Sequence, residues 1–163
     1  MIVYHGSFMI IEEPKIIYSN RAMDFGEGFY TTSDSAQAIE WARIGMIRRS
    51  YDKAILNIYE FDLVRASQEL KILKFEGPSQ KRLDFVIQNR LGGLFHDFDI
   101  VIGCVADDNV YRVINSYEEN EIDYYQAIHK LKTEKLVDQI LFHTEKALKY
   151  LKFIGYEEVS YES

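Results

Sequence analysis

The sequence has little cysteine, little proline and no excess of basic residues, and each shortage argues against a class of protein. The 163 residues include 1 Cys and 2 Pro, and the formal net charge is -7. A single cysteine allows neither a disulfide within the chain nor a cysteine-based metal cluster. An acidic surface disfavours tight non-specific binding to nucleic acid, because that binding depends on neutralising phosphates.

Long apolar segments are also missing. No apolar run approaches the roughly 20 residues of a membrane-spanning helix. The segment from Met1 to Ser7 lacks the charged and apolar regions of a secretory signal. We therefore expect a cytoplasmic protein with no membrane partner. Cys104 stands in the apolar run from Ile100 to Val105, which favours a small buried side chain over a nucleophile.

What the sequence does contain is a globular composition rich in aromatic side chains. Hydrophobic residues make up 47% and charged residues 28%, with 12 Tyr and 10 Phe. This length allows one domain with its own core. No repeat, low-complexity tract or Gly/Ser-rich linker divides the chain, so a single domain over residues 1–163 is expected. Arg43, Arg48 and Arg49 form one candidate basic patch, for which a solvated helix face is the favoured explanation.

Hydrophobic patterning predicts a mixed α+β fold. Asp34 is expected to cap a helix, with Gln37 three residues on and an apolar face that includes Trp41. No Gly-x-Gly-x-x-Gly opens a helix, so a dinucleotide-binding site of the doubly wound type is not expected. The predicted strands are 2–5, 28–32, 54–63, 70–75, 99–105, 139–142 and 153–159, and the other predicted helices are 79–90, 110–117, 121–131 and 144–151.

Two segments stand out as candidates for chemistry. His5 ends the first predicted strand and precedes Gly6 and Ser7, where a backbone can approach a ligand closely. The segment Asp24 to Thr32 combines two glycines with an aromatic pair. It forms either a hairpin loop with core aromatics or the floor of a ligand site, with Tyr30 as a stacking surface. The remaining histidines lack the spacing of a metal site and are interpreted as surface or satisfied residues; they are His96, His129 and His143.

These segments carry a resemblance to a known family. Tyr4 to Ser7 followed by Phe25 to Tyr30 resembles the poly(ADP-ribose) polymerase and diphtheria-toxin-like branch of ADP-ribosyltransferases. More closely, nearly the whole chain resembles a bacterial family first catalogued as a domain of unknown function. Its four motifs occur here in order, at His5 to Ser7, Asp24 to Thr32, Asp99 to Asp108 and Gln139 to Thr144. Members of that family often form the toxin-like half of toxin–antitoxin pairs.

The resemblance implies an ADP-ribosyltransferase-like split β-sheet core with inserted helices, with NAD as substrate and no metal. It implies that His5 bonds a ribose hydroxyl, that the Gly6 backbone holds the nicotinamide carboxamide and that Ser7 reaches the adenosine side. Tyr30 would stack on the nicotinamide ring. The implied NAD-binding residues are His5, Gly6, Ser7, Phe25, Gly28 and Tyr30.

The third catalytic position departs from the wider superfamily, which usually has Glu at the start of a late strand. Here that position is Gln139. Glutamine can hydrogen-bond a ribose hydroxyl, but it supplies neither a negative charge nor a general base. Polymer formation is therefore not expected, whereas transfer of a single ADP-ribose remains consistent with the sequence. Glu145, Asp107 and Asp108 could replace the base, although a helix-dipole role for Glu145 and turn formation for the Asp pair are favoured.

The expected function is that of an NAD-dependent mono-ADP-ribosyltransferase acting on a macromolecule, as the toxin partner of a small antitoxin protein. The acidic charge favours a protein acceptor slightly over a nucleic acid. Two alternatives stay open: a catalytically weak or inactive NAD-binding or protein-binding module, and an NAD glycohydrolase that uses water as acceptor.

Overall fold

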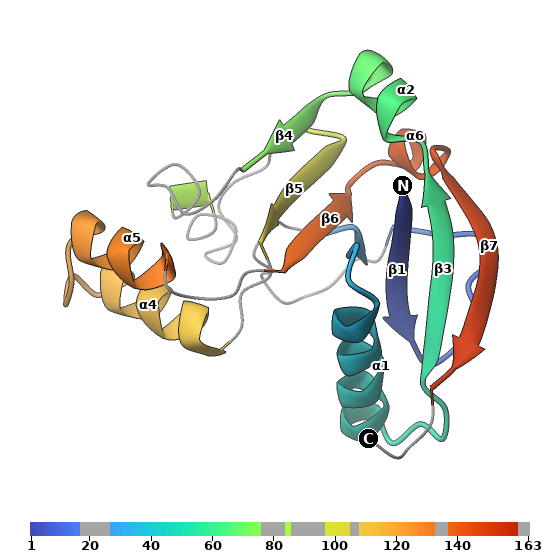
Figure 1. Cartoon of the computed structure of the whole chain (residues 1–163), viewed down its shortest axis with the longest axis horizontal. Helices are drawn as coiled ribbons and strands as arrows, with labels where there is room; N and C mark the ends of the chain where they lie inside the picture. The colour runs from blue at the N-terminus through green and yellow to red at the C-terminus, as the bar shows by residue number, and fades with distance from the viewer. Residues whose placement is uncertain (17–26, 76–83, 86–96, 105–107, 133–136, 160–163) are drawn as a thin grey trace.

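Helices and two small β-sheets make up the computed structural model, so the expected α+β class is confirmed (Figure 1). The structure describes residues 1–16, 27–75, 84–85, 97–104, 108–132 and 137–159. The strands are β1 (Ile2–Ser7), β2 (Phe29–Thr31), β3 (Ile55–Phe61), β4 (Ile72–Lys74), β5 (Ile100–Cys104), β6 (Asp138–Phe142) and β7 (Leu151–Glu158). The helices are α1 (Ser35–Arg49), α2 (Leu63–Glu69), α4 (Asp108–Glu118), α5 (Tyr124–Lys132) and α6 (Glu145–Leu148).

The two sheets meet at one backbone bridge. One sheet has the antiparallel order β1-β3-β7, and the other has the order β2-β6-β5-β4, in which only the β4–β5 pair is parallel. Tyr4 on β1 and Thr32, just after β2, exchange N–H···O=C hydrogen bonds of 2.8 and 3.0 Å. Within the described residues, backbone hydrogen bonds join the sheets only at this pair. We call the junction between β1 and β2 the seam.

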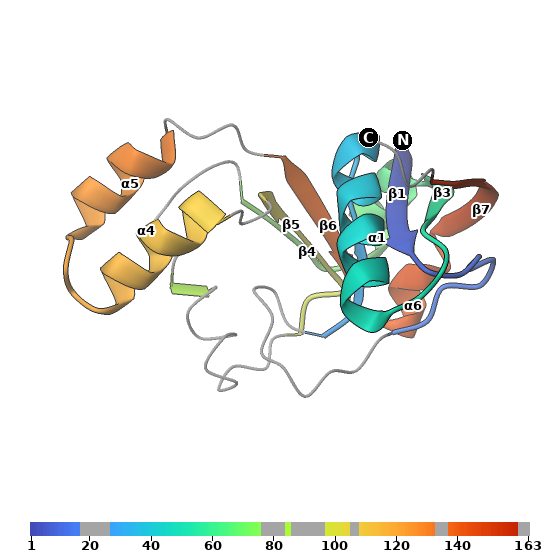
Figure 2. The same ribbon diagram turned by 90° about the horizontal axis from the view of Figure 1, so that it is seen from below.

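Apolar side chains cover both faces of the second sheet. On one face, Phe29, Ile100 and Phe142 pack into a cluster that also contains Val3 and Tyr59 of the first sheet. The other face carries the buried side chains of Leu73, Val101 and Leu141, packed with Ile114 of α4 and Ala127 of α5. Figures 1 and 2 show α4 and α5 side by side and well apart from α1.

Helix α1 covers the first sheet beside the seam. A Cβ atom at Gly6 would lie 2.1 Å from the Ala38 carbonyl oxygen, so this glycine allows the helix to pack directly on β1. Residues directly opposite in a sheet point to the same side. Because Tyr4 opposes Thr32, α1 and the α4–α5 pair lie on the same side of the joined strands.

Several predicted features are confirmed. Asp34 caps α1 by accepting a hydrogen bond of 3.2 Å from the Gln37 backbone N–H. The predicted apolar face of this helix is buried at Ala38, Ala42 and Met46, whereas Trp41 is half-buried. The strand predicted at 99–105 is central: it pairs with β4 and β6 and places Ile100 and Val101 in different clusters.

Other boundaries need correction. β1 does not end at His5, because Gly6 and Ser7 continue its pairing with β3. Leu63 does not extend the preceding strand; it begins α2, a helix missing from the prediction, which Asp62 caps by accepting from the Arg65 N–H at 3.2 Å. Leu151 opens β7 because it pairs with Phe61, instead of closing the helix that starts after Thr144.

One predicted helix lies mostly outside the described residues. Residues 79–90 lie outside the described residues except for Asp84 and Phe85, which are helical. Among the helices that the structure describes, none is both long and apolar enough to cross a membrane.

Leu141 tests the packing of the second sheet against α4 and α5. Its side chain is fully buried, so Leu141→Ala should lower the free energy of unfolding by about 2–5 kcal/mol, through lost apolar burial and the cavity left behind. Urea unfolding followed by circular dichroism measures the change. Ile154→Ala on β7, where the side chain is 48% exposed, is the control and should change it by less than about 0.5 kcal/mol. Equal effects would contradict the described core.

Candidate functional site

Three of the sequence motifs meet around the seam. The first motif is on β1, the second ends in β2, and the fourth begins on β6, which pairs with β2. Thr31 strengthens this pairing, because its hydroxyl donates a buried hydrogen bond of 2.8 Å to the Ile140 carbonyl. Residues more than a hundred positions apart in sequence therefore become neighbours.

His5 is buried at the seam, with 8% of its surface exposed. Its Nδ1 lies 2.6 Å from the Tyr30 carbonyl oxygen, and its ring stacks on Phe29 with centroids 4.2 Å apart. A carbonyl only accepts, so Nδ1 carries the hydrogen and Nε2 of the neutral ring is an acceptor. Burial lowers the pKa of His5 from 6.5 to about 4, and the hydrogen bond to Tyr30 partly opposes this shift. The ring is therefore neutral at pH 7.

The His5 ring fills the place where the two sheets diverge. In an antiparallel pair, hydrogen-bonded positions recur at every second residue. After Tyr4 and Thr32, the next such positions are Gly6 and Tyr30. In the described structure no backbone hydrogen bond joins them, and the imidazole reaches the Tyr30 carbonyl instead. The His5 side chain thus takes the place of a backbone hydrogen bond between the strands. The backbone N–H and C=O of Gly6 face the gap between β1 and β2 that remains.

Tyr30 and Gln139 share the face that lies on the α1 side of the seam. Tyr30 opposes Leu141, and Gln139 stands two residues before Leu141 on β6. Such diagonal neighbours are about 7–8 Å apart between Cα atoms, within reach of long side chains. Tyr30 is half-buried and packs against the cluster that contains Leu141. The sheet therefore brings these two predicted residues together, while the His5 ring enters the seam from the other face.

Gln139 is the unusual polar residue of this face. It is 7% exposed and opposes Gly103 on β5, a residue without a side chain. Within the described part of the chain, its side-chain amide makes no hydrogen bond. Its amide atoms are not among the fully buried, unpartnered side-chain atoms of the described structure, so they stay accessible to solvent or to a ligand. The amide can both donate and accept, so it suits a hydroxyl group.

Both motif glycines have a packing role that the sequence did not reveal. A Cβ at Gly28 would lie 2.4 Å from the Phe142 carbonyl oxygen, so β2 could not approach β6 as closely with any other residue. Gly6 plays the same part against α1. Ser7 is half-buried and pairs with Ile55 at the end of β1. Phe25 lies outside the described residues.

Of the three alternative bases, only Glu145 has a described side chain, and it does not join the site. Glu145 is exposed in the first turn of α6, beyond the opposite end of β6 from Gln139. Asp107 lies outside the described residues, and Asp108 is described only as the first residue of α4. No group of three or more His, Cys, Asp or Glu side chains suited to a metal occurs among the described residues.

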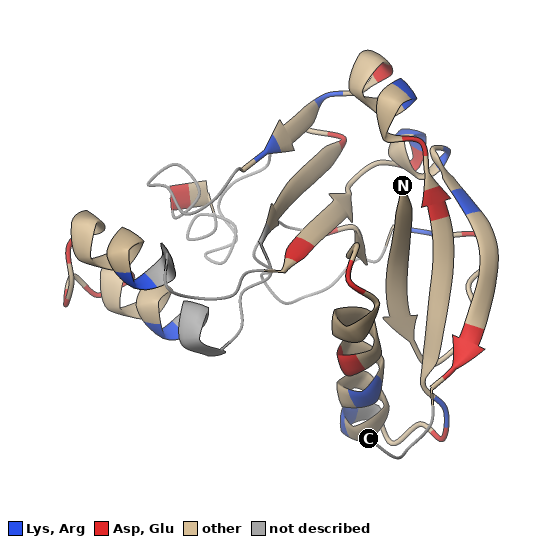
Figure 3. Cartoon of the chain, viewed as in Figure 1, with Lys and Arg blue, Asp and Glu red and all other residues tan. Residues whose placement is uncertain are grey.

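The structure gives positions for most of the other singled-out residues. His143 donates from Nδ1 to the Glu27 carbonyl at 2.7 Å, and His129 is exposed on α5. His96 lies outside the described residues. Figure 3 shows basic residues on the C-terminal half of α1, where Arg48 is exposed. Cys104 ends β5.

A residue that the sequence prediction missed is Asp138, immediately before Gln139. Its carboxylate accepts from the Thr32 hydroxyl at 3.1 Å, from the Ser33 backbone N–H at 2.8 Å and from the Ser33 hydroxyl. The available signal was an acidic residue at the start of one strand and a run of hydroxyl residues at the end of another. Only the pairing of β2 with β6 shows that the acidic residue and the hydroxyl residues interact.

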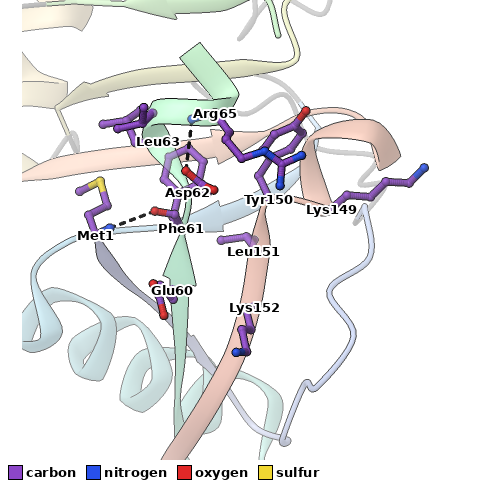
Figure 4. A pocket seen from close by; sticks show the side chains of 11 residues that line it. Met1, Glu60, Phe61, Asp62, Leu63, Arg65, Lys149, Tyr150, Leu151 and Lys152 are labelled. Atoms are coloured by element: carbon purple, nitrogen blue, oxygen red, sulfur yellow. Dashed lines mark hydrogen bonds between the residues drawn. The ribbon is translucent and has the colours of Figure 1, made fainter. Parts of the chain in front are cut away.

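A surface pocket occurs at a different place, between β3, α2 and β7 (Figure 4). The guanidinium of Arg65 lies 5.6 Å from the centre of the Tyr150 ring, and the Arg65 backbone N–H donates to Asp62 in this pocket. Charges of both signs line it, and none of the predicted site residues contributes. This pocket is therefore separate from the seam.

Comparison with known proteins places the chain in a family. The model of DUF3990, described as a protein of unknown function, matches residues 1–153, and the chain belongs to this family. No significant match was found among curated proteins or among solved structures. The expected resemblance to a domain of unknown function is thereby confirmed, and the family description assigns no activity.

Gly6 can be tested against a glycine in a similar setting. Gly6→Ala places a methyl group against the α1 backbone, which must shift, so the variant should lose about 1–3 kcal/mol of stability. Gly155→Ala on β7 is the control, because nothing lies within 4 Å of its added Cβ. Thermal unfolding of both variants measures the difference. If Gly6→Ala were as stable as the control, α1 would not pack on β1 as described.

The buried neutral state of His5 predicts a pH dependence of stability. The native pKa of about 4 lies below the unfolded value of about 6.5, so the unfolded chain binds more protons between these values. The contribution is complete above pH 6.5 and is lost as pH falls towards 4. Urea unfolding at pH 7 and pH 5 should therefore show a loss about 2 kcal/mol larger than in His5→Asn, which keeps a donor but does not titrate.

A direct measurement of His5 checks the same prediction. Titration of its imidazole resonances by NMR should give a pKa near 4. A His5 pKa close to 6.5, the value from which burial lowers it, would mean that the ring is not buried at the seam.

Proposed function

We propose that this protein is an NAD-dependent mono-ADP-ribosyltransferase that modifies a macromolecule, with the seam as its NAD site. The observation that carries the proposal is Gln139, a residue 7% exposed whose amide makes no hydrogen bond in the described structure and which shares a face with Tyr30. Two sheets that separate after one bridge, with His5 at the point of separation, agree with the split-sheet core of such enzymes.

Each residue at the seam fits one part of NAD. The Nε2 atom of neutral His5 can accept from a ribose hydroxyl, because Nδ1 already donates to Tyr30. The backbone of Gly6, which faces the opening between the strands, can pair with the nicotinamide carboxamide. The half-buried Tyr30 ring offers a surface on which nicotinamide can stack. Gln139 supplies the amide for a second hydroxyl.

The reaction breaks the bond between nicotinamide and C1′ of its ribose, and the leaving nicotinamide keeps the electron pair. A lone pair of the acceptor then forms a bond to C1′, and any acceptor proton passes to solvent. Neither Gln139 nor neutral His5 is an effective general base at pH 7, so this chain would contribute mainly by positioning. The toxin role and a small antitoxin partner are part of the same proposal and rest on the resemblance alone.

The neutral Gln139 also favours a second candidate, a module that binds NAD or a protein without turnover. In that case NAD would bind and no nicotinamide would be released. An NAD glycohydrolase would release nicotinamide without labelling any macromolecule. Incubation with labelled NAD and separated protein and nucleic-acid fractions distinguishes the three outcomes and identifies the acceptor class.

Substitution of Gln139 tests its role. Gln139→Ala should lower nicotinamide release at saturating NAD by about tenfold, because a buried hydrogen bond of about 0.5–1.5 kcal/mol is lost. Gln139→Glu preserves the shape and should restore or raise the rate. If the bond strengthens in the transition state, turnover falls more than NAD affinity, which calorimetry measures.

The matched control is Gln68→Ala, an exposed glutamine on α2. Its release rate should equal that of the wild type. A Gln139→Ala rate equal to that of Gln68→Ala would remove Gln139 from the site while leaving the enzyme proposal intact. Wild-type protein that neither binds NAD nor releases nicotinamide would disprove the proposed function.

A further inference from the structure

Asp138 links the strand of Gln139 to the strand of Tyr30. One oxygen of its carboxylate accepts from the Thr32 hydroxyl and the Ser33 N–H at 3.1 and 2.8 Å, and the other accepts from the Ser33 hydroxyl. All three donors follow β2 directly, while Asp138 opens β6. Three donors on one carboxylate make a defined junction, because hydrogen bonds to a charged group are about twice as strong as neutral ones.

The same junction reaches β1 and α1. The Thr32 backbone exchanges two hydrogen bonds with Tyr4, the residue before His5. Its hydroxyl, which donates to Asp138, also accepts from the Asp34 N–H at 3.1 Å, and Asp34 caps α1. Through Thr32, Asp138 is thus connected to the strand of each predicted catalytic residue and to the helix that packs on Gly6.

We propose that Asp138 is a positioning residue that, through Thr32 and Ser33, fixes Gln139 relative to Tyr30 and His5 across the seam. This inference rests on the proposed function. Gln139 has no hydrogen bond within the described residues to hold its amide, so its position depends on the backbone of β6. Displacement of a group that acts by orientation is costly, since catalysis by positioning depends on sub-ångström geometry.

The chain contains a similar carboxylate–threonine arrangement far from the seam. At the other end of β6, where it pairs with β5, the Asp99 carboxylate accepts from the Thr144 hydroxyl at 2.8 Å and from the Lys71 N–H at 3.0 Å. The Thr144 hydroxyl also caps a helix by accepting from the Ala147 N–H at 3.1 Å. Thr32 and Thr144 therefore make the same kinds of bonds, but only Thr32 contacts the carboxylate next to Gln139.

The experiment compares Thr32→Val with Thr144→Val, two replacements that keep shape and remove one hydroxyl each. Turnover and KM for NAD are measured by nicotinamide release, and the midpoint of thermal unfolding is measured for both. Thr32→Val should lower kcat by about tenfold with little change in KM, the scale of a lost hydrogen bond to a charged group. Thr32→Ser should restore most of kcat, because it returns the hydroxyl.

Thr144→Val should lower the midpoint of thermal unfolding about as much as Thr32→Val does, but it should retain wild-type kcat. Equal kcat for the two valine variants, or failure of Thr32→Ser to recover, would overturn the proposal. Amide hydrogen exchange separates this result from failure of the proposed function. If the wild type shows no NAD chemistry, faster exchange at Tyr4 and Thr32 in Thr32→Val alone would still support the junction, and unchanged exchange would overturn it.

Discussion

The backbone bridge between Tyr4 and Thr32 is the constraint on which the arrangement of the site depends. It aligns β1 with β2 and so fixes which side chains of the two sheets share a face. One step beyond it the ladder stops, and the His5 ring bonds the carbonyl that the next backbone rung would have used. If β1 and β2 paired along their whole length, the Gly6 backbone would be hydrogen-bonded to Tyr30 and no gap would remain there. If the two sheets were not joined at all, nothing would hold His5 against Tyr30.

Close packing on both sides of the bridge reinforces this arrangement. Gly6 admits α1 against β1, and Gly28 admits β2 against β6. The two glycines of the motifs are therefore explained by packing as well as by any approach of a ligand. A glycine motif can have both roles at once. The missing side chain lets a neighbouring backbone pack closely, and it also leaves space for a ligand.

The α+β class, the cap at Asp34 and the central strand over residues 100–104 could be predicted from the sequence, because these features depend on local patterning. The face shared by Tyr30 and Gln139 could not, since it follows from the register between β2 and β6. The same is true of the Asp138 junction, whose partners are 105 and 106 residues away. Helix α2 was missed because Leu63 continued an apolar run, while the cap at Asp62 ended the strand. Long-range pairing, not composition, decides these features.

Strand order also has a consequence for synthesis of the chain. β2 has only three residues and lies at the edge of its sheet, where its partner is β6, and the hydroxyl bond between them spans 109 residues. Non-local pairing of this kind forms slowly, because a long loop must close before the contact stabilises it. A nascent chain released up to α5 has His5 and Tyr30 but no strand on which to complete their surroundings. The surroundings of His5 and Tyr30 are therefore incomplete until β6 has left the ribosome.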